Sequence, residues 1–260
     1  VFTRTQELLG KHVPIFEAGF QTKEAIALAD VMLPVRKGGQ RAWKMVEVKS
    51  STTVKDYHRD DVAIQIFIAQ AAGVSVATAA VACIDSSWVY PGNGDYDGLL
   101  VDTDVTAEAV VRKDEVKGWI SEAHAIVAKK SEPTVRMGRH CSDPFECSFS
   151  AYCEGLVPAA EHPISVLPGA LSKSLKALVE TKALTELSQV PDALLNDKQQ
   201  RIKQVTLSGK RFFDKTAAAR ALAAYKLPAY FMDFETIQFA VPIWKGTRPY
   251  QQIPFQFSVQ

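Results

Sequence analysis

The sequence predicts an α/β fold, because segments with the pattern of strands alternate with segments with the pattern of helices. Apolar runs rich in β-branched residues predict three consecutive strands, at residues 13–20, 24–33 and 43–50. A helical pattern over 56–72 and an apolar run over 75–85 predict a helix and then a buried strand. This order favours a mixed sheet flanked by helices.

Two helices are expected in the first half of the chain. The helix over 56–72 has Asp56 as its expected N-cap and Gly73 as its expected stop. The helix over 107–130 has its apolar residues on one stripe, and it follows a loop and a strand over 88–106. Both helices are therefore expected to flank the sheet.

The second half of the chain is predicted to be mainly helical up to a last pair of strands. Residues 163–226 have the pattern of short helices joined by short loops. Leu227-Pro228 ends the last helix, because the residue before a proline is driven out of helical geometry. A strand over 229–239 follows, and a further strand begins at residue 253.

The composition is that of an ordinary globular protein. The 260 residues are 47% apolar, enough for one large domain or two small ones. No apolar run approaches the roughly 18 residues that a membrane span needs. No signal peptide is visible at the start of the sequence, which is Val1. We therefore expect a cytoplasmic protein without a membrane partner.

The net charge of +1 is unevenly distributed. Residues 1–168 hold 17 basic and 22 acidic side chains, residues 169–226 hold 11 and 5, and residues 227–260 hold 2 of each. A basic helical segment is suited to a phosphate backbone. A solvated helical face has the same composition, so the charge by itself is a weak indication of nucleic-acid binding.

Two of the predicted strands carry polar residues that are suited to a metal site. Asp30 lies in the second strand, and Glu47, Val48 and Lys49 lie near the end of the third. Since side chains alternate along a strand, Glu47 and Lys49 project from one face and Val48 from the other. If Asp30 ends its own strand, two carboxylates and one ammonium meet at one edge. Mg²⁺ or Mn²⁺ usually takes such carboxylates from a protein, and a nearby lysine can orient a water or stabilise a phosphodiester under attack.

A salt bridge between strands explains the same spacing without any chemistry, and spacing alone favours it. Other polar residues bear on the choice. Glu17 in the first strand is in a position to add a third carboxylate, and His58, Asp61 and Gln65 share one face of the following helix. Gln65 lies within an apolar run, where a buried amide needs partners. It either caps a neighbouring strand or faces the metal site.

Three cysteines with equal spacing form a second group. Cys141, Cys147 and Cys153 have five residues in each gap, and closely spaced cysteines without a secretory signal favour a metal over a disulfide. An iron–sulfur cluster or a structural zinc normally has four ligands. The fourth is Cys83, a residue upstream of the chain, or His140. Three unrelated cysteines are the alternative.

Asp30, Glu47-Val48-Lys49 and Gln65 resemble the PD-(D/E)xK nuclease superfamily. The branch they resemble most is the RecB-like one, which includes the CRISPR-adaptation nucleases and the AddB-type helicase–nucleases. The resemblance implies a restriction-endonuclease-like core, in which a mixed sheet is flanked by helices. One feature of the branch is missing, because Phe67 and Ala69 stand where a tyrosine often follows the glutamine.

This resemblance also implies roles for the individual residues. Asp30 and Glu47 would bind Mg²⁺ or Mn²⁺, possible further ligands being Glu17, His58 and the carbonyl of Val48. Lys49 would position or activate the attacking water, and Gln65 would orient Lys49 or contact DNA.

In the same branch, a C-terminal group of three cysteines and one cysteine far upstream hold a [4Fe–4S] cluster. Cys141, Cys147 and Cys153 match that group in order and position, whereas the upstream cysteine has no match in this sequence. The resemblance implies a cluster that pins this segment to the core.

Nearly all of residues 12–260 is similar to an uncharacterised bacterial family that joins this core to a DnaQ-like exonuclease domain. Asp233 and Glu235 lie two apart on the strand over 229–239, so they share one face. They match the first DxE motif of the DEDD exonucleases, which bind two metal ions. Residues 227–260 are thus expected to be the first strands of an RNase H-like domain that is cut at Gln260.

We therefore predict a metal-dependent nuclease, an exonuclease, that hydrolyses phosphodiester bonds of single-stranded DNA or of duplex ends. The predicted parts are a nuclease core with the cysteines (1–155), a helical module (156–226) and the start of the exonuclease domain (227–260). One alternative is a non-cleaving module that binds nucleic acid through the helices of 169–226 and is sensitive to salt. Another is a structural metal-cluster protein with an inactive nuclease core.

Overall fold

The structure is a computed structural model that describes residues 1–156, 159–226 and 228–260. The last helix of the second unit ends at Leu222, before the end that the sequence predicted at Leu227, and Leu227 itself lies outside these residues. Contacts divide the described chain into two compact units. The first unit comprises residues 1–133 and 230–260, and the second comprises residues 134–229. The division into three parts that the sequence suggested stays a prediction. The two units are described one at a time below.

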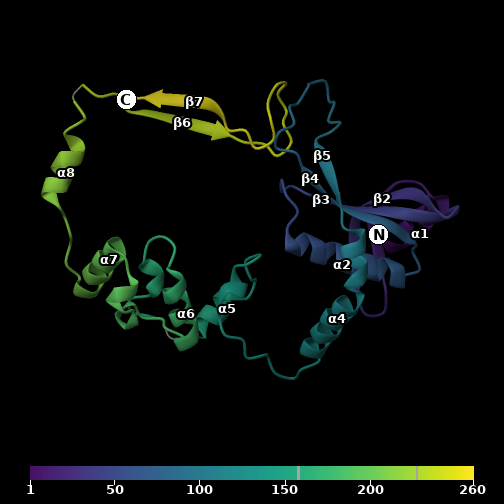
Figure 1. Cartoon of the computed structure of the whole chain (residues 1–260), viewed down its shortest axis with the longest axis horizontal. Coiled ribbons are helices and arrows are strands. Elements are labelled where there is room, and N and C mark those ends of the chain that lie inside the picture. Colours follow the sequence, from purple (N-terminus) through teal and green to yellow (C-terminus); the bar gives the residue numbers. More distant parts are fainter. Residues whose placement is uncertain (157–158, 227) are drawn as a thin grey trace. The chain divides into compact units, whose positions relative to one another are not determined.

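The first unit is built on a five-stranded mixed sheet (Figure 1). Its strands lie in chain order across the sheet: β1 (Ile15–Gln21), β2 (Ile26–Lys37), β3 (Gln40–Lys49), β4 (Val76–Ile84) and β5 (Leu100–Asp104). β3 and β4 run parallel, and the other neighbours are antiparallel. The predicted mixed sheet with flanking helices is confirmed.

Four helices accompany this sheet: α1 (Phe2–Lys11), α2 (Asp56–Ala71), α3 (Thr106–Val111) and α4 (Lys113–Val127). α2 packs against β1, β2 and β4, and its buried residues join those of the strands in one apolar core. Among the largest fully buried side chains of this core are Phe20, Met32, Met45, Ile66 and Ile68. The helix α2 therefore holds its inward face at a fixed place on the sheet.

The helix predicted over 107–130 is two helices, which are separated at Arg112. The guanidinium of Arg112 donates to Asp60 on α2 (2.5 Å) and to Glu115 on α4 (2.7 Å). It also lies over the ring of Trp119 at 5.1 Å. These contacts hold the chain at a corner, which the apolar stripe of the sequence did not indicate.

Side-chain alternation reverses part of the way along β1 and β2. The paired residues Ile15 and Met32 are buried, and so are the paired residues Phe20 and Ala27, although five positions separate the two pairs on each strand. The backbone pairing skips the position between them where Glu17 (φ 54°) faces Asp30. β2 continues to Lys37, beyond the predicted end at residue 33, so the condition that Asp30 ends its strand is not met.

Helix α1 lies along the edge strand β1 and supplies a hydrogen-bond acceptor to it. The Thr5 hydroxyl accepts the N–H of Gly19 at 2.9 Å and donates to the carbonyl of Val1 at 3.2 Å. The helix approaches so closely that a Cβ at Gly19 would lie 2.7 Å from Cγ1 of Val1. Glycine at position 19 thus permits α1 to satisfy a backbone donor on a sheet edge.

Replacement of Thr5 by valine is expected to lower the free energy of unfolding by about 1–3 kcal/mol, because the shape is kept while the N–H of Gly19 loses its partner. Thr3→Val on the exposed side of α1 is the control, with an expected change under about 0.5 kcal/mol. Urea unfolding of both variants measures the difference. Equal effects of the two substitutions would show that the Thr5 hydroxyl does not stabilise the fold.

The strands β6 (Met232–Ile237) and β7 (Ile253–Val259) form a separate two-stranded antiparallel sheet within the first unit. The loop between them contacts the loop after β4. The N–H of Tyr90 donates to Thr247 (3.0 Å), and the N–H of Gly246 donates back to Tyr90 (2.8 Å). The Tyr250 hydroxyl donates to the carbonyl of Ser50, the residue after Lys49. The 230–260 segment therefore contacts the end of β3.

The second unit contains short helices around a small core. Its helices are α5 (Ser150–Gly155), α6 (Lys173–Lys182), α7 (Asp197–Ser208) and α8 (Lys215–Leu222), with short 3-10 turns between them. The buried residues of the core are Ile164, Leu167, Leu175, Leu187, Val190 and Leu195. The prediction of short helices over 163–226 is confirmed for the described residues.

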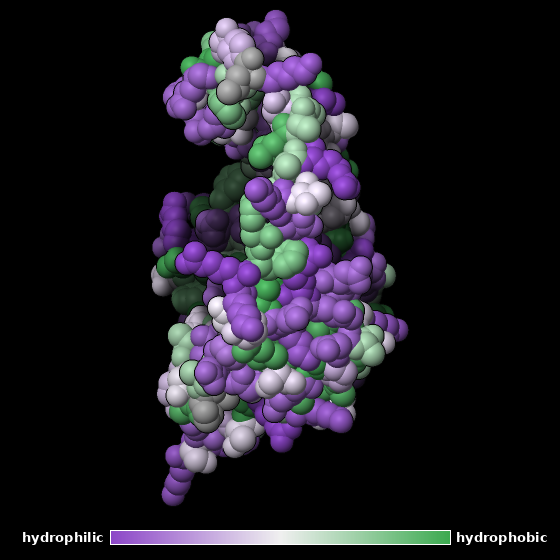
Figure 2. All heavy atoms as spheres, turned by 90° about the vertical axis from the view of Figure 1, so that its left-hand side faces the viewer, coloured by the Kyte–Doolittle hydropathy of each residue, from purple (hydrophilic) through white to green (hydrophobic). Residues whose placement is uncertain are grey.

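Hydrophobic and hydrophilic side chains are interspersed on the face of the molecule drawn in Figure 2. Within the described ranges, none of the helices has the length and apolar character required to cross a membrane.

Candidate active site

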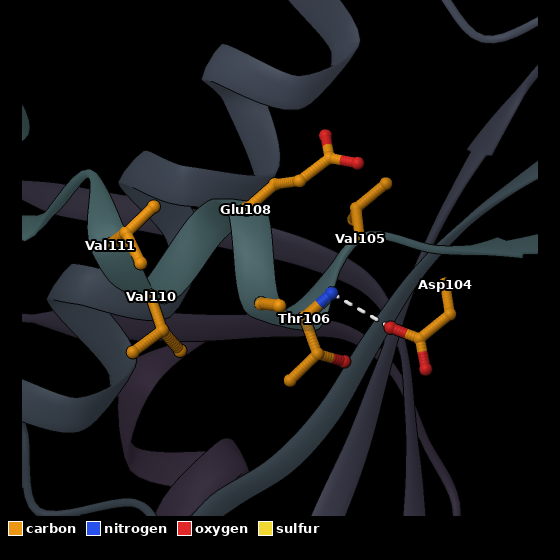
Figure 3. Close-up of a pocket in the computed structure, with 7 residues that line it drawn as sticks. Asp104, Val105, Thr106, Glu108, Val110 and Val111 are labelled. Carbon is orange, nitrogen blue, oxygen red and sulfur yellow. Dashed lines mark hydrogen bonds between the residues drawn. The ribbon is translucent and has the colours of Figure 1, made fainter.

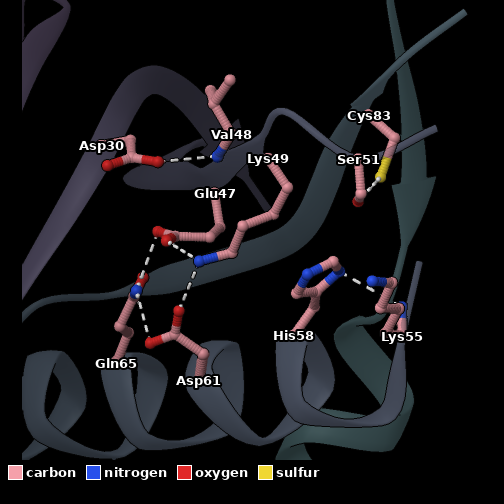
Figure 4. Close-up of polar contacts among 10 residues, drawn as sticks. All are labelled: Asp30, Glu47, Val48, Lys49, Ser51, Lys55, His58, Asp61, Gln65 and Cys83. Atoms are coloured by element: carbon pink, nitrogen blue, oxygen red, sulfur yellow. Dashed lines mark hydrogen bonds and ion pairs between the residues drawn. The ribbon is translucent and has the colours of Figure 1, made fainter. Parts of the chain in front are cut away.

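The end of β3 places an acidic and a basic side chain opposite α2 (Figure 4). The ammonium of Lys49 lies 2.6 Å from Oε1 of Glu47 and 2.7 Å from Oδ2 of Asp61 on α2. The contact between Glu47 and Lys49 agrees with their predicted projection from one face of the strand. Lys49 thus joins β3 to the helix that covers it.

The amide of Gln65 completes this arrangement from the next turn of α2. Its Nε2 donates to Oε2 of Glu47 at 2.8 Å and to Oδ1 of Asp61 at 3.1 Å. Gln65 thus contacts the side chains of Glu47 and Asp61, and its role beside a metal stays a prediction. Its Oε1 is buried and accepts no hydrogen bond from the described residues, so one acceptor of this amide is left without a donor.

Asp30 reaches the same edge of the sheet from β2. Its Oδ2 accepts the N–H of Val48 at 2.7 Å, and the register of β2 and β3 places Asp30 opposite Glu47. Glu17 lies opposite Asp30 on β1 and is exposed. The carboxylates of Asp30 and Glu47 therefore belong to neighbouring strands at one level of the sheet, beside the backbone of Val48.

Burial, hydrogen bonds and neighbouring charges shift the pKa values of Glu47 and Lys49 at the end of β3. Burial raises the pKa of Glu47 above its ordinary value, despite hydrogen bonds from Lys49 and Gln65 that oppose the shift. Burial would lower the pKa of Lys49, but the hydrogen bonds to Asp61 and Glu47 outweigh it and raise that pKa. Lys49 is therefore a cation at neutral pH.

His58 is buried at the start of α2, where its ring has a structural contact. Its Nδ1 accepts the N–H of Lys55 at 3.1 Å, and Figure 4 shows the ring beside Lys55. Lys55, and not the predicted Asp56, is the N-cap residue of α2. Burial lowers the pKa of His58, and the charges of Lys49 and Lys55 add to this. In a neutral ring whose Nδ1 accepts, Nε2 carries the proton, so His58 would have to give up the hydrogen bond from Lys55 or its Nε2 proton to bind a metal.

The donor set at this edge fits Mg²⁺ or Mn²⁺ in part. Among the residues that the structure describes, no three His, Cys, Asp or Glu side chains are grouped closely enough to hold an ion. The ammonium of Lys49 lies between Glu47 and Asp61 and separates these two carboxylates. Asp30, Glu47 and the Val48 carbonyl are nonetheless oxygen donors at one edge, and the buried Oε1 of Gln65 is suited to accept from a metal-bound water.

The three evenly spaced cysteines lie in one segment of the second unit. The N–H of Cys147 donates to the carbonyl of Cys141 (2.8 Å), and Cys153 lies on α5. All three are free and partly exposed. Cys83 is buried in β4 of the first unit, with its sulfur 3.7 Å from the hydroxyl of Ser51. The segment thus offers three of the four ligands that a cluster requires, so the fit to [4Fe–4S] is incomplete.

Asp233 and Glu235 lie on β6 and are exposed. Opposite them on β7 stand Ser258 and Gln256, so this face of the small sheet is polar. The structure thus confirms the strand and the shared face that the sequence predicted. It leaves the proposed metal-binding role of the two carboxylates as a prediction.

Asp61 is a site residue that the sequence did not single out. The sequence showed it on one face with His58 and Gln65, but polar residues in the first turns of a helix are usually solvated. Its spacing of four residues before Gln65 was the available signal, because such residues are neighbours on a helix surface.

A pocket elsewhere in the first unit does not contribute to this site (Figure 3). It lies at the start of α3 and is lined mainly by valines and threonine, among them Val105, Thr106, Val110 and Val111. The carboxylate of Glu108 at its rim pairs with Arg59. The lining lacks the converging polar groups that are present at the end of β3.

In a comparison with known families, residues 230–260 match a domain of unknown function (DUF2779). The matched segment contains β6, β7 and the loop that contacts Tyr90 and Ser50. No curated protein matches the chain.

Proposed function

We propose that the chain is a metal-dependent nuclease that hydrolyses phosphodiester bonds in DNA. The observation that carries the proposal is the contact of Lys49 with Glu47 and Asp61, held by Gln65 beside Asp30. Polar groups gathered at the edge of an otherwise apolar core are costly unless they have partners or a function. A buried amide oxygen left without a donor supports a function rather than a completed structural network.

The chain's own residues suggest distinct roles. Asp30, Glu47 and the Val48 carbonyl would hold Mg²⁺ or Mn²⁺, with Glu17 or His58 as further ligands. The metal when bound would supply Lewis-acid stabilisation of the phosphate and lower the pKa of a water.

Lys49 is a cation by its raised pKa, so it would donate a hydrogen bond and stabilise negative charge on the phosphate, not remove a proton. Asp61 and Gln65 would hold Lys49 and Glu47 in place.

The remaining sequence predictions belong to the same proposal. A restriction-endonuclease-like core would carry the site, and Cys141, Cys147 and Cys153 would bind a [4Fe–4S] cluster with a structural role. Asp233 and Glu235 would begin the metal site of an RNase H-like domain. DNA as partner and a cytoplasmic location are further parts of the proposal.

The experiment that tests the proposal is a divalent-metal titration with labelled single-stranded and duplex DNA. Cleavage is expected with Mg²⁺ or Mn²⁺, none with excess EDTA, and recovery when the metal is restored, since the principal proposed ligands are oxygen donors. The same assay with RNA substrates of matched sequence shows whether the chain cleaves DNA, RNA or both. DNA binding without cleavage under every metal condition would contradict the proposal and favour a non-cleaving nucleic-acid-binding module.

A further inference from the structure

The positive charge of the second unit is confined to its C-terminal part. Residues 196–226 hold eight basic and two acidic side chains, whereas residues 169–195 hold three of each. We call residues 201–226 the basic–aromatic segment; it contains the end of α7, the loop to α8, and α8 itself. A charge this uneven within one small unit produces a positive surface.

Aromatic rings are exposed among these basic side chains. Phe212 is 52% exposed, Phe213 is 76% exposed and Tyr225 is 77% exposed; the two phenylalanines follow Lys210 and Arg211 directly, and Tyr225 precedes a lysine. The guanidinium of Arg201 lies over the ring of Phe212, 4.4 Å from its centroid. Other rings of the described chain are equally exposed, so it is the combination of exposed rings with neighbouring cations, and not exposure alone, that suits a binding surface.

The acidic residues nearby do not neutralise this surface. Asp192 pairs with Lys203, and the carboxylate of Asp214 accepts the N–H of Ala217 as the N-cap of α8. Lys210 and Arg211 have no ion pair within the described part of the chain. Their charges are therefore free to meet an anionic partner.

We propose that the basic–aromatic segment binds single-stranded nucleic acid. Lysine and arginine would contact the phosphates, while Phe212 and Phe213 would stack on bases. Unpaired bases present a face to an aromatic ring, whereas the bases of a duplex are already stacked, so the rings favour a single strand. The two phenylalanines lie in a loop and not on the apolar face of a long amphipathic helix, which disfavours a membrane surface.

This inference does not rest on the proposed nuclease activity, since binding is measured in EDTA, where metal-dependent cleavage is silent. The test is fluorescence anisotropy of the full chain with a labelled oligothymidylate of about 20 nucleotides, over a range of salt concentrations. The parent is expected to bind with an affinity that falls steeply as salt increases.

Two variants separate the two kinds of contact. Phe212→Ala/Phe213→Ala is expected to weaken binding by about 10- to 100-fold with an unchanged salt dependence, because stacking is lost and no charge is removed. Lys210→Gln/Arg211→Gln is expected to reduce the slope of log affinity against log salt by about 1.4, because two phosphate contacts are lost.

The matched control is Lys173→Gln/Lys176→Gln, which removes two exposed charges from α6, outside the segment. Its affinity is expected to stay within about twofold of the parent and its slope to change by less than half as much. Circular dichroism verifies that all variants are folded. The inference is overturned if the phenylalanine variant binds the oligothymidylate like the parent, if the control weakens binding as much as Lys210→Gln/Arg211→Gln, or if only anionic phosphatidylserine vesicles bind the parent.

Discussion

Replacing Lys49 with alanine is expected to reduce metal-dependent DNA cleavage by about 10²- to 10⁴-fold. The Lys49 ammonium is held by Glu47 and Asp61, and no other cation contacts either carboxylate in the described chain. Loss of this charge would remove the donor that we assign to the phosphate, while the oxygen ligands for the metal remain. Single-turnover cleavage at saturating Mg²⁺ measures the effect on the chemical step.

The control for this substitution is Lys44→Ala on the same strand. Lys44 pairs with Asp102 at 2.6 Å, so the control also removes a lysine–carboxylate pair from β3, but away from Gln65 and Asp61. Cleavage by the Lys44 variant is expected to remain within about threefold of the parent, because exposed pairs contribute little. If the Lys49 variant cleaves DNA as well as the parent, the assignment of this site is lost.

Replacing Lys49 with alanine is also expected to change how the free energy of unfolding depends on pH. Without the ammonium, burial and the charges of Asp61 and Asp30 still act on Glu47, so its pKa is expected to rise further above the ordinary value. A carboxyl with a raised folded-state pKa binds more protons in the folded than in the unfolded protein. Stability therefore falls as pH rises through that window, and the deficit of the Lys49 variant against the parent is expected to be larger above the window than below it.

Strand and helix periodicity predicted part of this site, because one of its pairs is local and one residue follows from the apolar face of a helix. Glu47 and Lys49 are two residues apart on a regular strand, and Gln65 faces them because an apolar helix must turn its inward side to the sheet. The packing of α2 on the strands then determines which polar residue of α2 contacts Lys49. Asp61 was missed for that reason, since periodicity does not tell a solvated first-turn carboxylate from one that meets a lysine.

The position of Asp30 depended on backbone geometry that the sequence does not display. Regular alternation would have continued along β2, but the left-handed conformation of Glu17 and the reversal of the buried face occur where Glu17 and Asp30 meet. Non-glycine residues adopt this conformation rarely, so strand patterns do not predict it. The corner at Arg112 likewise arises from contacts with Asp60 and Glu115, which only the assembled helices bring together.

Glu47→Gln is expected to abolish metal-dependent cleavage, with a loss of at least about 10²-fold, and yet to leave the free energy of unfolding within about 1 kcal/mol of the parent. The substitution removes a proposed metal ligand. It also removes a buried carboxylate whose pKa is raised by burial, so the folded protein is relieved of a charge that is costly to bury.

Two features of the structure limit the structural damage. Lys49 keeps Asp61 as its partner, so no buried ammonium is left uncompensated. A flip of the Gln65 amide would present its Oε1, which has no donor among the described residues, to the new amide at position 47, at the cost of the hydrogen bond from Gln65 to Asp61. Urea unfolding and cleavage assays of the same preparation measure both quantities, with Asp102→Asn as the control that weakens the exposed pair of Lys44.

The two measurements together distinguish a working site from a salt bridge that only joins β3 to α2. A structural salt bridge predicts that Glu47→Gln lowers stability and leaves any cleavage by the chain intact. A metal site predicts the reverse, because a carboxylate retained for chemistry is one that the fold does not need for its own stability. Cleavage at the parent rate with a loss of several kcal/mol in stability would therefore assign Glu47 and Lys49 to the fold and not to catalysis.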